Sequence, residues 1–120
     1  MQDRPTAVEL LEAVREFLGQ DVMPAVEGWV RFHTRVAVNA LGMLERELRL
    51  GPELAAADRA RLGALLGHDA DLAALTAELA GRIRDGSLDD RRDDVVAAVR
   101  DSVRAKLLVS NPDYVADHVG

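Results

Sequence analysis

The sequence predicts an all-α protein, built as a single compact bundle of four long helices plus one short helix. Three observations favour this class. Apolar residues recur at helical spacing, the composition is biased towards Ala, Leu, Glu and Arg, and Gly and Pro divide the chain into helix-length segments. The chain of 120 residues has the length of one domain, so we expect a single helical-bundle domain over residues 1–120.

Composition and charge narrow the possible functions. The formal net charge of −6 argues against general nucleic-acid binding, which requires a basic surface. The chain has no cysteine, which excludes disulfides and thiolate metal sites. No apolar stretch approaches the roughly 18–20 residues of a membrane span, and Met1–Pro5 is too polar for a signal peptide. We therefore expect a cytoplasmic protein that binds neither nucleic acid nor membrane and carries no cofactor or metal.

The first helix is predicted to begin near Ala7, because Thr6 and Glu9 form a capping-box pattern. Gly19 and Pro24 then weaken and end it, leaving a short turn before Gly28. Its expected inner face consists of Leu10, Leu11, Val14, Phe17 and Leu18.

The stretch Trp29–Leu50 is predicted to be the central helix of the bundle, ending at Gly51-Pro52. Its apolar arc covers roughly half of the helical wheel, so we expect it to face inward and to touch at least two other helices. The arc consists of Trp29, Val36, Ala40, Met43, Leu44 and Leu48. A basic stripe on the opposite side either docks an acidic partner or pairs with nearby Glu residues in solvent. That stripe consists of Arg31, Arg35, Arg46 and Arg49.

Three further helices are expected. One spans about Glu53–Leu66 and ends at Gly67, and the next has Asp69 as its N-cap and ends before Gly86-Ser87. The smooth flank of this second helix would let another helix approach closely, and it consists of Ala70, Ala73, Ala77 and Ala80. The last helix begins in a cluster of Asp residues and ends at Asn111-Pro112. Its expected inner stripe is Val95, Val96, Val99, Val103 and Leu107.

A few polar residues lie in apolar company and are the candidate site residues. Glu47 on the central helix and Lys106 on the last helix are candidates for a buried ion pair, or else both extend to solvent near the bundle ends. His33, Arg35 and Asn39 are candidates for binding a small anion or acyl ligand. The alternative is structural, with His33 in the core, Asn39 fixing helix packing and Arg35 on the surface.

The sequence contains no known catalytic template. It has no His-Glu-x-x-His motif, no phosphate-binding loop and no glycine-rich dinucleotide fingerprint. We therefore assign no catalytic residue, and an enzyme is the least favoured interpretation.

Several segments together resemble a bacterial domain family of unknown function. They are Met1-Gln2-Asp3-Arg4-Pro5-Thr6, Glu9-Leu10-Leu11, Phe32-His33-x-Arg35-Val36-Ala37-x-Asn39, Arg46-Glu47-Leu48-x-Leu50-Gly51-Pro52 and Lys106-Leu107-x-Val109-x-Asn111-Pro112-x-Tyr114. Members of that family tend to occur beside acyl-CoA dehydrogenases and aminoglycoside-phosphotransferase-like kinases. The resemblance therefore implies a role near acyl-CoA metabolism, and it supplies no activity, cofactor or catalytic residue.

Two functions follow as expectations. The first is a non-catalytic accessory or protein-interaction module that binds a kinase-like or dehydrogenase partner, or another copy of itself as a homo-oligomer. The alternative is a protein that binds a small ligand, an acyl chain or a CoA-like anion, between its helices.

Overall fold

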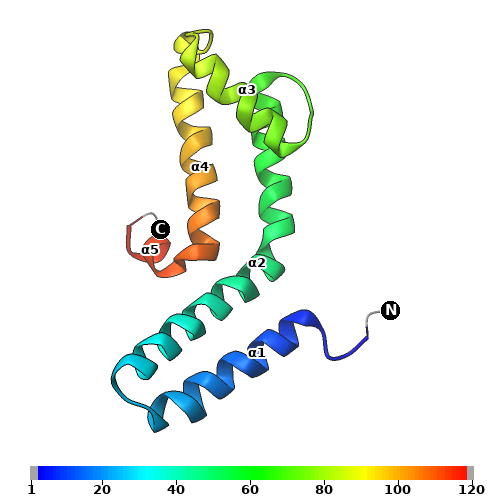
Figure 1. Ribbon diagram of the computed structural model, residues 1–120. Helices are drawn as coiled ribbons and strands as arrows, with labels where there is room; N and C mark the ends of the chain where they lie inside the picture. Colours follow the sequence, from blue (N-terminus) through cyan, green and yellow to red (C-terminus); the bar gives the residue numbers. More distant parts are fainter. Residues whose placement is uncertain (1–2, 119–120) are drawn as a thin grey trace. The chain divides into compact units, whose positions relative to one another are not determined.

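The computed structural model describes residues 3–118, apart from the side chain of His118, so Met1 and Gln2 of the family-like opening lie outside it. The described residues form helices and no strand, which confirms the all-α class (Figure 1). The α-helices are α1 (Ala7–Phe17), α2 (Gly28–Leu66), α3 (Leu72–Arg84), α4 (Arg92–Ser110) and α5 (Pro112–His118). A π-helical turn (Leu18–Val22) and two 3₁₀ turns (Met23–Ala25 and Asp89–Arg91) complete the chain.

The contacts within the chain group into two compact units, Met1–Leu50 and Gly51–Gly120. The first unit holds α1 and the first half of α2, and the second holds the rest of α2 with α3, α4 and α5. The expectation of one domain over residues 1–120 stays a prediction, and each unit is described by itself below.

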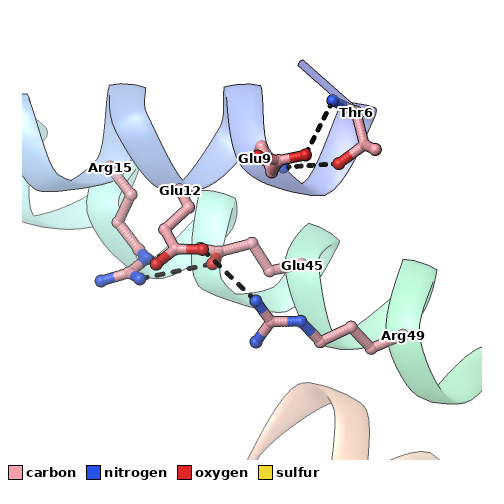
Figure 2. Close-up of polar contacts among 6 residues, drawn as sticks. All are labelled: Thr6, Glu9, Glu12, Arg15, Glu45 and Arg49. Carbon is pink, nitrogen blue, oxygen red and sulfur yellow. Dashed lines mark hydrogen bonds and ion pairs between the residues drawn. The ribbon is translucent and has the colours of Figure 1, made fainter. Parts of the chain in front are cut away.

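The first unit is a pair of antiparallel helices that starts with the predicted cap. The Thr6 hydroxyl accepts from the Glu9 amide at 3.2 Å, and the Glu9 carboxylate accepts from the Thr6 amide at 3.2 Å (Figure 2). Helix α1 then packs against the first half of α2 (Figure 1), where a Cβ added to Gly42 would lie 4.0 Å from Arg15 Cδ. A Cβ at residue 42 would therefore make only an ordinary van der Waals contact with α1, and its closest neighbour would be Arg46 Nη1 of the same helix at 3.3 Å.

The structure contradicts the predicted inner face of Trp29–Leu50. The residues of α2 buried in this unit are Thr34 and Glu45, which lie on the opposite side of the helix from the predicted arc. Trp29 is 75% exposed, and the other large side chains of that arc are exposed as well: Val36, Met43, Leu44 and Leu48. On α1, Leu10, Val14 and Phe17 were also expected inside and are exposed.

The predicted helix end at Gly51-Pro52 is also wrong. Helix α2 continues through both residues to Leu66, with Pro52 inside it. Proline has no amide hydrogen, so the Leu48 carbonyl loses its helical partner at this point. The missing hydrogen bond therefore weakens α2 at the boundary between the two units.

The hydrophobic core lies in the second unit. Leu75 is fully buried, and it packs with residues from the end of α2, from α3, from the following loop and from α4. The other buried members of this cluster are Leu62, Leu65, Leu66, Leu79, Leu88 and Ala98. Leucines from α2, from α3 and from the following loop thus form this core, and α4 contributes Ala98.

Glycine ends α2 as predicted, because Gly67 has the positive φ of +87° that side chains disfavour. The N-cap of α3 is Asp71, which accepts from the Ala74 amide at 2.8 Å, and not Asp69 as predicted. Asp69 instead binds Arg59 through two hydrogen bonds of 2.8 and 3.0 Å.

Helix α4 turns its small residues inward. Ala98 and Ala105 are buried, whereas Val96, Val99 and Val103 are 40–49% exposed, so the predicted valine stripe is wrong except at its partly buried ends. The segment after Asn111 forms α5, and its Val115 is buried. No helix in the described part of the chain is both long and apolar enough to cross a membrane.

Candidate functional site

The outer side of α2 in the first unit carries a regular row of exposed residues, which we call the outer seam. Its members are spaced alternately by four and three residues, the pattern of a coiled-coil contact. The outer seam consists of Trp29, His33, Val36, Ala40, Met43, Glu47 and Leu50, and all seven side chains are exposed. Exposed apolar residues in one contiguous row are typical of a surface that binds another protein.

An aromatic cluster forms the N-terminal end of the outer seam. The rings of Trp29 and His33 meet edge to face, with centroids 4.2 Å apart. The Phe32 ring lies beside the same imidazole at 5.4 Å between centroids and is 60% exposed. Trp is over-represented among residues that dominate binding energy at protein interfaces. This end of the outer seam is therefore its strongest candidate contact.

A buried ion pair holds the reverse side of α2 against α1. The Glu45 carboxylate is 5% exposed and accepts from Arg15 Nε and, at 3.3 Å, from Arg15 Nη2 (Figure 2). This hydrogen bond is the main reason that the pKa of Arg15 is raised, and burial partly opposes it. A second pair, Arg49 to Glu12 at 3.4 Å, is more exposed. Polar contacts thus hold the hairpin, and many of its large apolar side chains are exposed.

The structure does not bring the three candidate ligand residues together. His33, Arg35 and Asn39 are all exposed. At 100° per residue, Arg35 leaves the helix about 160° away from His33 and so faces another direction. None of these three residues lines either of the two hollows described below. Ligand binding by these residues stays a prediction.

Glu47 and Lys106 are both exposed, which agrees with the alternative in which both extend to solvent. Glu47 belongs to the first unit and Lys106 to the second. Their ion pair stays a prediction.

Two hollows lie in the second unit. One of about 420 Å³ lies between the end of α3 and the start of α4, and its lining is apolar apart from two charged residues. It is lined by Ile83, Leu88, Asp89, Arg92, Val95 and Val96. A shallower one of about 390 Å³ lies over the end of α2, lined by Ala56, Arg59, Ala60, Gly63, Ala64, His68 and Asp69.

Polar clusters that the sequence did not indicate join the helices of the second unit. Asp58 on α2 accepts from Ser102 on α4 at 2.5 Å and from Arg61 at 2.6 Å. Arg91 donates to the Leu65 carbonyl at 2.7 Å, which satisfies one of the free carbonyls at the end of α2. These groups have roles in holding helices together, because their partners are all within the fold.

A further polar pair joins His68, after the end of α2, to Glu78 on α3. His68 Nε2 lies 2.6 Å from Glu78 Oε1, and this hydrogen bond, together with the charge of Glu78, raises the pKa of His68. Within residues 3–118, no group of three or more His, Cys, Asp or Glu side chains could hold a metal ion.

Comparison with known protein families identifies the family of this chain. The model of a family described as Domain of unknown function (DUF6285) matches residues 24–114, more than half of the chain. The chain belongs to the DUF6285 family. The DUF6285 match contains the whole outer seam and excludes α1. No curated protein and no solved structure matches the chain.

Sequence reasoning found the residues of the outer seam but assigned them to the core. The available signal was the second apolar strip on the same helix, Ala37, Val38 and Leu41, whose side chains are half-buried. Periodicity shows that a helix has apolar sides, and it does not show which side the same chain covers.

Proposed function

We propose that this DUF6285 protein is a non-catalytic protein-interaction module whose outer seam binds a protein surface. The observation that carries the proposal is the inverted burial of the first unit. Its buried residues among those described are Thr34 and Glu45, while Trp29, Phe32 and Val36 are 48–75% exposed. Exposing apolar surface to water costs about 25 cal/mol for each Å². A partner that covers these side chains would recover this free energy.

The aromatic residues support the same proposal. The chain has four of them, and Phe17, Trp29, Phe32 and Tyr114 are all at least 43% exposed. Aromatic side chains are enriched at interfaces, because they bury a large area at low entropic cost. Candidate partners are a second copy of the chain and the acyl-CoA dehydrogenases or phosphotransferase-like kinases that the family resemblance suggests.

Two valines of equal exposure provide a matched test. Val36 in the outer seam is 48% exposed, and Val103 on α4 is 49% exposed. We expect Val36→Asp to weaken association at least about tenfold, since about 1.4 kcal/mol at a central contact is tenfold in affinity. Val103→Asp should leave association unchanged, and both variants should keep wild-type helicity by circular dichroism.

The measurements are sedimentation velocity of the full chain alone and co-purification with each candidate enzyme. A wild-type protein that stays monomeric and retains neither enzyme would contradict the proposal. Equal effects of the two variants would show that the interface lies outside the outer seam.

A second candidate function is favoured by the hollow between α3 and α4. Its volume of about 420 Å³ lies within the range of small-molecule sites, about 300–1,000 Å³. Arg92 at its edge would bind the anionic part of an acyl or CoA-like ligand. We expect such a ligand to raise the melting temperature of the wild type and not of Val96→Trp, which fills the hollow. No stabilisation of the wild type by an acyl-CoA would exclude this function.

A further inference from the structure

We infer that the occupant of the outer seam is the outer seam of a second copy, running antiparallel and centred on Ala40. This inference rests on the proposed function and names its partner. It begins from the positions of His33 and Glu47, the only two titratable residues among the seven of the outer seam.

The two polar residues are placed symmetrically. Both His33 and Glu47 lie seven residues from Ala40. When two identical helices pack antiparallel about Ala40, His33 of each copy therefore faces Glu47 of the other. An imidazole N–H can donate to a carboxylate, so both polar groups gain a partner in one arrangement. A two-fold symmetric interface forms this contact twice.

One apolar contact fits the same register. Val36 of the outer seam then lies opposite Leu44, an exposed residue that borders the outer seam, since this pair is also centred on residue 40. The crossing point itself holds Ala40 against Ala40, and small side chains there let two helices approach closely. Every one of these side chains is exposed in the single chain and so is free to make the contact.

The parallel alternative is disfavoured by charge. A parallel in-register pair would place Glu47 beside Glu47, and like charges directly opposite each other are destabilising. It would also leave each His33 without a carboxylate to bind. A buried polar pair is known to fix the register and orientation of coiled coils at some cost in stability. His33 and Glu47 would have this role here, selecting one orientation among those that the apolar residues alone permit.

Charge exchange tests the register directly. His33→Glu should place Glu against Glu47 of the second copy, and we expect the dimer dissociation constant to rise at least about tenfold. Glu47→Lys alone should also weaken the dimer. The double variant His33→Glu/Glu47→Lys places Glu opposite Lys and should return the dissociation constant to within about threefold of the wild type.

The matched control carries the same charges in another place. His33→Glu/Asp101→Lys has the same net charge as the exchanged double variant, and Asp101 is an exposed residue of α4 outside the outer seam. This control should remain as weak as His33→Glu. The measurement is sedimentation equilibrium of the full chain over a wide concentration range, with circular dichroism to verify folding.

The outcomes separate this inference from the proposed function. A double variant no tighter than His33→Glu would overturn the antiparallel register. A specific dimer has a Kd far below about 100 µM. A wild type that is monomeric at about 100 µM would therefore overturn self-association. If that monomer still binds an enzyme in a Val36-dependent manner, the interaction module stands with another partner, and if it binds none, both proposals fail.

Discussion

At the scale of single residues, the buried carboxylate of Glu45 is the polar group on which the hairpin most depends. Arg15→Ala would leave it uncompensated in the α1–α2 contact. We expect a loss of about 2–3 kcal/mol in the free energy of unfolding, below the 3–5 kcal/mol of fully buried pairs, because Arg15 is 34% exposed. Urea unfolding followed by circular dichroism measures it.

The exposed pair of the same hairpin is the control for this prediction. Arg49→Ala removes an ion pair to Glu12 whose side chains are 55% and 42% exposed, and it should cost less than about 1 kcal/mol. Equal losses in the two variants would show that burial does not distinguish the pairs.

His68 gives the protein a predictable dependence on pH. Its pKa is raised above 6.5 by the hydrogen bond to Glu78 and by the charge of that carboxylate. The contribution of this pair to stability is therefore complete below about pH 6.5, the unfolded pKa, and is lost as the pH rises through the raised folded value. In Glu78→Gln, NMR titration should find the pKa of His68 shifted down towards 6.5. An unchanged pKa would contradict the assigned partner.

At the scale of helices, Pro52 is the residue that most weakens α2. It lies inside the helix and cannot donate to the Leu48 carbonyl. Pro52→Ala should therefore raise the free energy of unfolding by about 1–3 kcal/mol, less the smaller effect of a more flexible unfolded chain. The midpoint of urea unfolding measures it.

Pro112 provides the comparison, because it is the first residue of α5, where a missing amide hydrogen has no cost. Pro112→Ala should change stability by less than about 0.5 kcal/mol. A destabilised Pro52→Ala protein would show that the proline is required at the boundary between the two units.

Helix positions were largely predictable from the sequence, and helix faces were not. The capping box of Thr6 and Glu9 and the end at Gly67 depend on residues a few positions apart, so local chemistry decides them. Glu45 is buried because Arg15, 30 residues earlier, reaches it, and no local pattern contains that pairing. Trp29 and Val36 face outward for a similar long-range reason. Helix α2 has two apolar sides, and α1 covers the side that does not contain them.

The predicted helix end at Gly51-Pro52 is wrong for a related reason. A proline at that point suits the first turn of a new helix and also permits a continuous helix that lacks one hydrogen bond. The flanking segments are both strong helix formers, and the structure adopts the continuous form.

At the scale of the whole molecule, the two units have different means of stability. The second unit has a leucine core with Leu75 at its centre. The first unit is a helical hairpin with its apolar seam exposed, and a pair of helices rarely supplies a sufficient core alone. We therefore expect the hairpin to gain much of its stability from association, so its melting temperature should rise with protein concentration.

The most direct test of the central claim uses the absence of cysteine from the chain. In the antiparallel arrangement Ala40 faces Ala40 of the second copy, so Ala40→Cys should form an intermolecular disulfide on mild oxidation. Ala97→Cys, at an exposed residue of α4, is the control and should not do so. The account predicts a disulfide-linked dimer for Ala40→Cys on non-reducing gels at protein concentrations where Ala97→Cys stays monomeric. Failure of Ala40→Cys to cross-link, or equal cross-linking of both variants, would contradict it.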